Sequence, residues 1–430
     1  MICDNISINE KGHLTFANRD TVELAQKYGT PLYVMDEEKI REKCRAYICA
    51  MSANFSDSMP LFASKSCSFV GIYKIIKQEN MGIDVVSSGE LFTALKADFS
   101  AKNIFFHGNN KTESDIKYGM ENKVGYFVCD NFDELFALQR EAENQKIVQK
   151  ILLRLTPGID PHTHEKISTG KIDSKFGVSI DTNDAEKLAA QALLLKNIKL
   201  CGYHCHIGSQ TFDTKPFTDA AKIMLKFSAL IKEKYKFEAE ILNLGGGIGV
   251  AYLESQTSPD IEKNIKIIAD CIKSECAVLK LCQPKVLMEP GRSIVADGGM
   301  TLYTAGSFKK IEGYKNYVSV DGGMPDNPRY ALYEAPYTIF NASNADKKAD
   351  IPCSVVGRCC ESGDILQENV MLPVTKRGDI IAVLTTGAYN YSMASNYNRI
   401  PRPPIVMLAK SGDYTAVKRE SFDDLIKNEL

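Results

Sequence analysis

The sequence contains no hydrophobic run that approaches the roughly 20 apolar residues of a membrane-spanning helix. Its start, Met-Ile-Cys-Asp-Asn, lacks the basic flank and apolar stretch of a secretory signal, so we expect a cytoplasmic protein. It also lacks a basic tract, and its net charge is only -2, so the sequence gives no sign of a positively charged surface that would bind a nucleic acid or an anionic membrane. These absences indicate a small-molecule partner, with no nucleic acid and no membrane.

Metal-binding patterns are also missing. His204 and His206, with His162 and His164, suggest a metal site, but no acidic or cysteine partners stand at recognised zinc spacings, so no metal is expected. His206 is better used as a ring stacked on a flat cofactor, and His204 is expected to be a satisfied core histidine. The 13 cysteines, in a chain without a signal, are expected to be reduced thiols and not a disulfide framework.

Short apolar runs recur along the first 291 residues, with charged stretches of helical character between them. Their composition predicts strands buried on both faces, and the intervals leave room for a crossover helix each time. Eight such units predict a (β/α)8 barrel of the TIM type. The eight runs are 61–66, 83–88, 103–108, 125–130, 151–157, 200–208, 241–247 and 286–291. A ninth run, 31–35, is interpreted as leading into the barrel without being one of its strands.

The pattern changes after residue 291 to short alternating segments with glycine and proline turns, which predict an antiparallel β-barrel or sandwich domain. The clearest segments are 317–320, 351–356, 379–384 and 405–408, and the polar stretch 341–350 is expected to be an exposed loop. Because residues 6–16 alternate in the same way, the N-terminus is expected to join that sheet. The predicted domains are therefore a barrel of residues 31–291 and a β domain of residues 1–30 plus 292–430.

Unusual polar residues cluster where the apolar runs end. The active sites of barrel enzymes lie at the carboxyl ends of the strands, so these residues are expected to share one site. They are Lys65, Ser87, Asn109, Arg154, His206, Gly245, Gly246, Gly247, Glu289 and Arg292.

Two of these features predict pyridoxal 5'-phosphate. The run Leu-Gly-Gly-Gly-Ile-Gly, residues 244–249, does not fit the dinucleotide fingerprint, because Val250 stands where a glycine is required. Adjacent glycines supply unobstructed backbone amides for a phosphate, although a tight turn is the alternative. Lys65 could form a salt bridge or, if desolvated, an imine with a carbonyl cofactor. A cofactor with both an aldehyde and a phosphate would use both features.

With these motifs, the sequence resembles the fold-type III pyridoxal phosphate decarboxylases, and among them most closely the diaminopimelate decarboxylases. The resemblance rests on Lys65, His-Ile-Gly-Ser-Gln at 206–210, the triple glycine and Glu-Pro-Gly-Arg at 289–292. It extends through nearly the whole chain, with further motifs at 28–34, 84–90, 174–177 and 387–390. The resemblance implies decarboxylation of meso-diaminopimelate to L-lysine, the last step of lysine biosynthesis, by a homodimer with shared active sites.

The resemblance also implies residue roles. Lys65 is the imine-forming lysine, His206 stacks on the cofactor ring and Glu289 keeps the pyridine nitrogen protonated, so that the ring can accept electrons. Two larger groups complete the site. The phosphate and cofactor cradle is expected from Ser209, Gly245, Gly246, Gly247, Glu289, Pro290, Gly291, Arg292 and Tyr389, and the substrate's distal carboxylate is expected to bind Arg292, Arg329, Tyr333 and Tyr389.

The segment Cys-Glu-Ser-Gly-Asp, residues 360–364, separates relatives by substrate, because relatives acting on ornithine typically have Cys-Asp here. The resemblance implies that Cys360, from the partner subunit, protonates the intermediate and that Glu361 binds the distal ammonium. Reprotonation by Cys360 or by Lys65 stays open. Cys359 is a departure from the family pattern that adds a second thiol.

Three alternatives remain. The chain could decarboxylate another substrate on the same scaffold, such as ornithine, arginine or carboxynorspermidine. It could also be a regulatory protein that binds the cofactor without catalysis, although such a protein would be expected to have lost Lys65 or Cys360. A racemase is disfavoured by Glu289, which suits a stronger electron sink than racemases of this fold use.

Overall fold

The computed structural model describes residues 2–159 and 174–430. It divides into two compact units, and the division differs from the expected domains at residues 31–42 and 250–258. The barrel unit contains Lys43–Gly249 and Pro259–Gly291, and the β unit contains Met1–Glu42, Val250–Ser258 and Arg292–Leu430. His162 and His164 lie outside the described residues. None of the described helices combines the length and apolar character needed to cross a bilayer.

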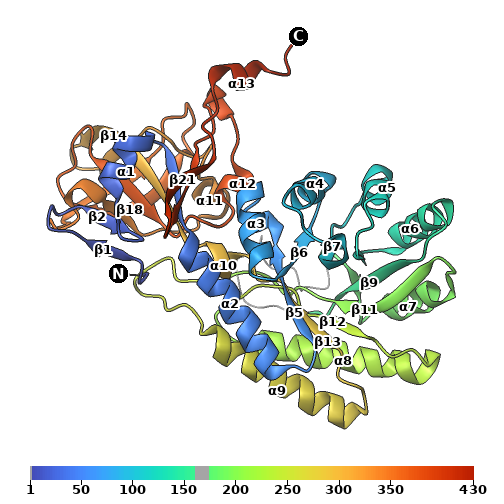
Figure 1. Cartoon of the computed structure of the whole chain (residues 1–430). Coiled ribbons are helices and arrows are strands. Elements are labelled where there is room, and N and C mark those ends of the chain that lie inside the picture. Colours follow the sequence, from blue (N-terminus) through green and yellow to red (C-terminus); the bar gives the residue numbers. More distant parts are fainter. Residues whose placement is uncertain (1, 160–173) are drawn as a thin grey trace. The chain divides into compact units, whose positions relative to one another are not determined.

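The barrel unit is a closed ring of eight parallel strands, as predicted, with helices outside it (Figure 1). All eight apolar runs form its strands, in the order β9, β11, β12, β13, β5, β6, β7, β8, and pairing of β8 with β9 closes the ring. The strands are β5 (Ser58–Ala63), β6 (Gly82–Val85), β7 (Ile104–Phe106), β8 (Tyr126–Cys129), β9 (Gln149–Thr156), β11 (Ile198–His204), β12 (Ile241–Asn243) and β13 (Lys285–Met288). The short β10 (Val178–Ser179) adds to β9.

Helices follow most barrel strands, and several of them begin at side chains that cap their free backbone amides. Ser87 caps α4, Asn131 caps α6, and Thr112 with Asp115 forms a capping box at α5. The helices of this region are α2 (Glu37–Asn54), α3 (Val70–Gln78), α4 (Ser88–Lys96), α5 (Glu113–Glu121), α6 (Phe132–Asn144), α7 (Asp184–Leu194), α8 (Lys215–Tyr235) and α9 (Ile261–Leu279), with 3-10 turns η1 (Ser64–Ser66) and η2 (Ala101–Asn103).

One buried side chain from nearly every strand fills the interior of the barrel. Because side chains alternate across a strand, the residues that point inward meet in a layer, and the interior is a packed core and not a channel. The layer consists of Leu61, Phe105, Val128, Leu152, Cys201, Ile241 and Leu287.

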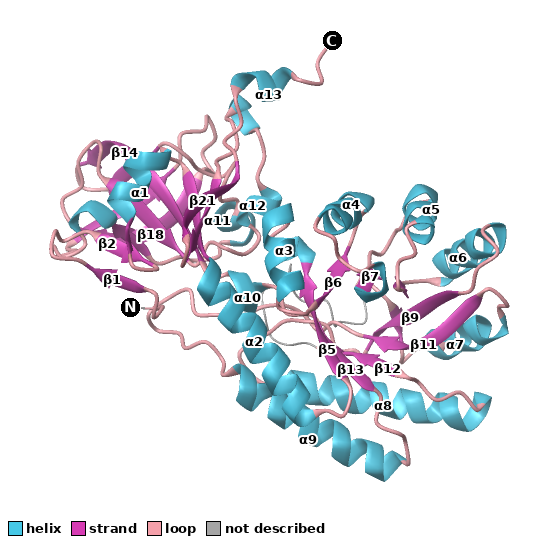
Figure 2. Ribbon diagram, viewed as in Figure 1, coloured by secondary structure: helices cyan, strands magenta, loops and turns pink. Residues whose placement is uncertain are grey.

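The β unit is built on a mixed sheet with short helices around it (Figure 2). Its path runs β18, β17, β15, β14, β4, β20, β21, with β19 and β16 attached to β14. Most pairings are antiparallel, but β15 with β17 and β20 with β4 are parallel. The strands are β4 (Leu32–Asp36), β14 (Gly299–Ile311), β15 (Lys315–Val320), β16 (Ile339–Asn341), β17 (Ile351–Val356), β18 (Ile365–Leu372), β19 (Ile380–Leu384), β20 (Ile405–Ala409) and β21 (Gly412–Val417).

Three expectations about this unit need correction. The run 31–35 forms β4, which is not a barrel strand, as expected, but which pairs with β14 and β20 and so belongs to the β unit and not to the barrel. Residues 6–16 do not join the large sheet, because β1 (Ile6–Ile8), β2 (Leu14–Phe16) and β3 (Arg19–Asp20) form a sheet of their own. The stretch 341–350 is only partly exposed, since Asn341 is buried and donates to Thr375 and Asp379.

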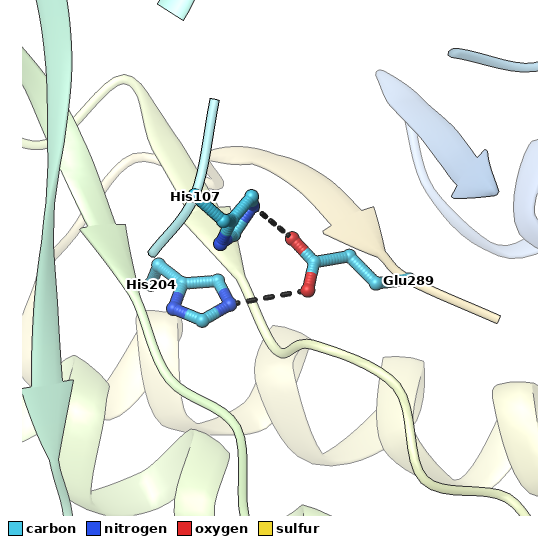
Figure 3. A group of neighbouring side chains, drawn as sticks. All are labelled: His107, His204 and Glu289. Atoms are coloured by element: carbon cyan, nitrogen blue, oxygen red, sulfur yellow. Dashed lines mark hydrogen bonds and ion pairs between the residues drawn. The ribbon is translucent and has the colours of Figure 1, made fainter. Parts of the chain in front are cut away.

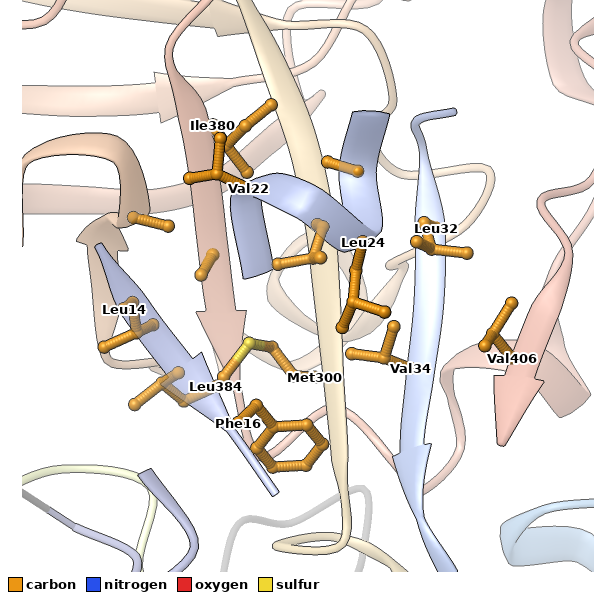
Figure 4. Close-up of a cluster of buried hydrophobic side chains, with 14 of the residues drawn as sticks. Leu14, Phe16, Val22, Leu24, Leu32, Val34, Met300, Ile380, Leu384 and Val406 are labelled. Carbon is orange, nitrogen blue, oxygen red and sulfur yellow. The ribbon is translucent and has the colours of Figure 1, made fainter. Parts of the chain in front are cut away.

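An apolar cluster joins the small N-terminal sheet to the large sheet (Figure 4). Leu14 and Phe16 pack with Met300 and Leu384, so the two sheets share one core although they share no strand. The remaining helices of the unit are α1 (Thr21–Tyr28), α10 (Arg292–Val295), α11 (Arg329–Tyr333), α12 (Asn390–Met393) and α13 (Phe422–Ile426), with 3-10 turns η4 (Ala342–Asn344) and η5 (Tyr397–Arg399).

Candidate active site

A tight turn after β5 presents Lys65. Ser64, the residue before it, donates its backbone N–H to Asp84 Oδ1 (3.1 Å) and its hydroxyl to Glu90 Oε2 (2.7 Å). Ser66, the residue after it, donates its hydroxyl to the carbonyl of Ala63 (2.8 Å). The 84–90 motif therefore holds the turn that carries Lys65. The side chain of Lys65 is exposed, so the desolvation that we expected for it is not provided by the described part of the chain.

Two buried carboxyl groups lie near Lys65. Burial, and next the charge of Glu289, hold the pKa of Asp84 well above its usual value, while the Lys65 cation opposes the shift. Lys65, Asp84 and Glu289 follow or end the neighbouring strands β5, β6 and β13, so the structure brings them together at the carboxyl end of the barrel. Ser87 and Asn109 follow the strands β6 and β7, and each has a local contact. Ser87 caps α4, and the carbonyl of Asn109 accepts a hydrogen bond from Asn131.

Glu289 is held by three side chains that lie at the ends of other strands, and Figure 3 shows two of them, His107 and His204. His204 Nε2 is hydrogen-bonded to its Oε2 (3.2 Å), His107 Nε2 lies 2.9 Å from its Oε1, and Asn243 Nδ2 donates to Oε1 (2.7 Å). Burial by itself would raise the pKa of Glu289, but the contacts with the two histidines outweigh it and hold that pKa well below the usual range. Glu289 is therefore a buried anion at the carboxyl end of β13.

The glycine run after β12 packs against the Glu289 turn and has no room for side chains. A Cβ on Gly246 would lie 2.1 Å from the carbonyl oxygen of Glu289, and Gly245 and Gly247 have φ values of 66° and 133°. Gly291 packs in the same way on the Lys65 turn, where a Cβ would lie 2.8 Å from the Cβ of Ala63. Side chains are therefore excluded at both places, and the backbone amides of these turns are not covered by side chains of their own, which suits a phosphate.

His206 and Ser209 lie in the loop after β11, beside the glycine run. A Cβ on Gly245 would come within 2.8 Å of the His206 ring. Thr211, just beyond Ser209, pairs with Ile248 in a parallel bridge, which fixes the two loops to each other. Burial, and next the Lys65 cation, hold the pKa of His206 well below its usual value, so its ring is neutral and suited to stacking.

These features of the barrel unit fit pyridoxal phosphate. They comprise an accessible lysine, a buried anion for the ring nitrogen, a neutral imidazole and a glycine loop that a Cβ would fill. Arg154, from β9, is buried nearby and stacks 4.4 Å over the ring of Phe176.

The β unit contains two buried arginines surrounded by tyrosines. Arg292 Nη1 donates to the Tyr252 hydroxyl (2.7 Å), and its guanidinium lies 4.9 Å from the centre of the Tyr389 ring. Arg329 Nη1 donates to the Tyr337 hydroxyl (2.9 Å), and its guanidinium lies 4.4 Å from the centre of the Tyr252 ring. Among the described residues, no carboxylate forms an ion pair with Arg329, and the groups that act on its charge are tyrosines.

Tyr333 is the last residue of α11, the helix that begins at Arg329, and it is half-buried. Tyr389 has a left-handed backbone conformation, with φ of 68°, at the start of α12. The next residue, Asn390, is fully buried and hydrogen-bonded to Tyr337. This contact connects the 387–390 motif to the tyrosine that holds Arg329.

Cys360 and Glu361 are exposed on a loop of the β unit that Asp364 organises. The buried Asp364 carboxylate accepts the backbone N–H groups of Met324 (2.6 Å) and Cys359 (2.7 Å). Burial, and next the Asp364 carboxylate, raise the pKa of the Cys359 thiol to about 12. Cys360 is therefore the more accessible thiol of the pair. In the described part of the chain, no hydrogen bond or ion pair joins Cys360 or Glu361 to Arg329.

Comparison with known proteins settles the family. The model described as "Pyridoxal-dependent decarboxylase, pyridoxal binding domain" matches residues 37–296. The chain belongs to the pyridoxal-dependent decarboxylases. This decarboxylase is 42% identical to the diaminopimelate decarboxylase of Bacillus subtilis (strain 168) over 98% of this chain and 96% of the relative. It is 43% identical to that of Staphylococcus aureus (strain COL) over 99% of both chains.

The solved structures agree. The decarboxylase is similar to the diaminopimelate decarboxylase of M. jannaschii in complex with L-lysine, with a TM-score of 0.91 and 34% identity over 99% of this chain and 98% of the other. The family assignment, the barrel with an additional β domain, and pyridoxal phosphate as the cofactor are therefore confirmed.

Sequence reasoning missed several residues around the predicted site of the decarboxylase. His204 contacts Glu289 and is not merely a core histidine, and His107 and Asn243 were not singled out. Their position at the end of a strand was the available signal, since His107 follows β7 directly and Asn243 ends β12. Tyr252 and Tyr337 had no such signal, because their role depends on contacts between segments far apart in the chain.

Proposed function

We propose that this decarboxylase acts on meso-2,6-diaminopimelate and releases carbon dioxide and L-lysine. The supporting observation is the buried Arg329, whose partners in the described part of the β unit are tyrosines and include no carboxylate; Arg292 is buried too and contacts the same Tyr252. A buried cation without a carboxylate partner favours an anionic ligand, and a guanidinium binds a carboxylate in a bidentate manner. Diaminopimelate carries a second carboxylate, which ornithine and arginine lack. The named relatives and the lysine complex of the M. jannaschii enzyme point to the same substrate.

Residues of the barrel unit would hold the cofactor. Lys65 would bind its aldehyde carbon and His206 would lie against its ring, while Glu289 would pair with the ring nitrogen. When bound, pyridoxal phosphate supplies an electron sink for the pair left behind by departing carbon dioxide. The phosphate would be held by Ser209, Gly245, Gly246 and Gly247 together with the turn of Pro290, Gly291 and Arg292, and by Tyr389.

Residues of the β unit would select the substrate. Arg292, Arg329, Tyr333 and Tyr389 would bind the distal carboxylate, and Glu361 would bind the distal ammonium. Cys360 would donate a proton to the carbon that has lost its carboxyl group, with Lys65 as the alternative donor. Cys360 and Glu361 would come from the partner subunit of a homodimer, and the enzyme would work in the cytoplasm.

A substrate panel tests this proposal. The purified protein is combined with pyridoxal phosphate and, separately, with meso-diaminopimelate, ornithine and arginine, and carbon dioxide release and cofactor absorbance are followed. Release from diaminopimelate alone is the expected result. Comparable turnover of ornithine would refute the distal-carboxylate pocket, and cofactor binding without release from any substrate would point to a binding protein or an untested substrate.

A further inference from the structure

Glu289 is surrounded by donors in an arrangement that its role as a partner of the cofactor does not by itself require. Both carboxylate oxygens are engaged within the protein, Oε1 by His107 and Asn243 and Oε2 by His204. His107, His204 and Glu289 are each less than 9% exposed. The two imidazole rings meet edge to face at a centroid distance of 4.8 Å, so each limits the rotation of the other.

The hydrogen bonds of His204 identify its protonation state. Nε2 faces the carboxylate, and Nδ1 is buried without a hydrogen-bond partner in the described part of the chain. A protonated imidazole would place an N–H donor at Nδ1 with no acceptor, which is costly in a buried site. A neutral ring with its proton on Nε2 leaves an unsatisfied acceptor at Nδ1, which costs less than an unsatisfied donor on a charged ring. His204 is therefore a neutral donor to an ionised Glu289.

Backbone contacts fix the other two side chains that contact Glu289, Asn243 as a donor and His107 as an imidazole 2.9 Å from Oε1. The backbone N–H of His107 donates to the carbonyl of Val85 (2.7 Å), and Lys111 Nζ donates to the next carbonyl, that of Gly108 (2.9 Å). Asn243 Oδ1 accepts the backbone N–H of Gly245 (2.9 Å), which orients its amide nitrogen toward Glu289. The donors are thus set before any ligand binds, and reorganisation on binding is small.

We propose that His204, assisted by His107, is a positioning residue that keeps Glu289 ionised and in one orientation, ready to pair with the protonated ring nitrogen of the cofactor. This inference rests on the proposed function and extends it to residues that do not themselves contact the reacting atoms. Losing the donor would lower the proton affinity of the ring nitrogen and weaken the electron sink. Other charged or titratable groups near Glu289 are Asp84, Arg154, Cys205 and His206.

Three substitutions of His204 distinguish a role as hydrogen-bond donor from a role in side-chain packing alone. In His204→Gln the amide nitrogen reaches the position of Nε2, whereas in His204→Asn it corresponds to Nδ1, and His204→Leu has no donor. We expect kcat to fall about 10- to 100-fold in the Asn and Leu variants, the loss of one hydrogen bond to a charged group, with little change in KM. The Gln variant should recover most of the loss. His13→Gln, on the β unit, is the matched control and should behave as the wild type.

The second readout is the 15N chemical shift of ring-labelled pyridoxal phosphate bound to each variant, which reports protonation of the ring nitrogen directly. Wild type, His13→Gln and His204→Gln should show a protonated nitrogen, and His204→Leu should lose that proton at a lower pH. Failure of the wild type to bind the cofactor would refute the proposed function itself.

Two results would overturn the inference while leaving the function intact. One is that His204→Leu keeps the wild-type kcat and 15N shift, or that kcat falls equally in the Gln and Leu variants. Either outcome would indicate that His204 contributes only packing and not a hydrogen bond. The other is a stoichiometric metal ion in the purified protein that His204→Leu removes and His13→Gln retains. His107, His204 and Glu289 offer atoms within 4.8 Å of one another, so a metal would then account for their arrangement.

Discussion

Substitution of Arg329 by methionine should separate recognition of the distal carboxylate from the rest of the reaction. The guanidinium is 6% exposed and is held by the Tyr337 hydroxyl and the Tyr252 ring, so it is positioned before substrate binds. Burial by itself would lower its pKa, but these tyrosines raise it above the ordinary value, and the group stays charged. Methionine keeps the length and apolar stem of the side chain and removes the charge.

The expected loss follows from hydrogen bonds to a charged group, each worth about 1.5 to 3 kcal/mol. Two such bonds to one carboxylate correspond to about 3 kcal/mol or more, a fall of roughly 10²-fold or more in kcat/KM for meso-diaminopimelate. Stability should change little, because replacing a buried charge by an apolar residue of similar volume is often neutral or stabilising. Thermal unfolding of the variant checks this point.

The assay compares kcat/KM for meso-diaminopimelate with that for L-lysine, which lacks only the distal carboxylate. In Arg329→Met the ratio of the two values should collapse, because the diaminopimelate value falls while the lysine value does not. Arg377→Met is the matched control, since Arg377 is exposed and donates to the carbonyl of Gly306. A variant that keeps the wild-type preference for diaminopimelate would show that Arg329 does not bind the carboxylate.

Three further outcomes follow from the structure. Burial lowers the pKa of His204 from 6.5 to about 4, so on acidification the unfolded chain binds a proton at this residue before the folded chain does. The free energy of unfolding should therefore fall by up to roughly 3 kcal/mol between pH 6.5 and 4. In His204→Gln, urea unfolding should show a weaker dependence on pH over this range. Glu134→Gln breaks a buried ion pair with Lys111 (2.7 Å) and should cost about 3 kcal/mol or more in urea unfolding, whereas Lys117→Met at an exposed 3.9 Å pair should cost under about 1 kcal/mol. Cys360→Ser should lower kcat by roughly 10²-fold, while Cys359→Ser should leave kcat near the wild-type value. Iodoacetamide should label Cys360 before Cys359, and the reverse order of labelling would contradict the assignment.

Local sequence was sufficient for the barrel and for several residues around Lys65 and Glu289. Strands buried on both faces consist of continuous apolar runs, and the residues that end them must lie at one edge of a parallel barrel, so Lys65, His206 and Glu289 could be assigned to one region before any coordinates. The roles assigned to them came from long, ordered motifs that resemble a known family.

The strands at the N-terminus and the choice of sheet for β4 were harder to predict, because the same alternating pattern fits any sheet. Residues 6–16 alternate correctly, yet their partners are each other, and β4 belongs to the sheet of the β unit although a helix of barrel type follows it. Alternation determines which face of a strand is buried but not which strand lies beside it.

The sequence by itself determined the fold class and the cofactor, because these depend on residue type, on spacing along the chain and on motifs shared with a known family. Only the tertiary structure decided which groups touch. His107, Asn243 and His204 meet at Glu289 from three strands, and Tyr252 and Tyr337 meet at Arg329 from separate segments. Burial and neighbouring charges set the protonation states of Glu289 and Arg329. Both depend on contacts between residues distant in sequence, which no local pattern encodes.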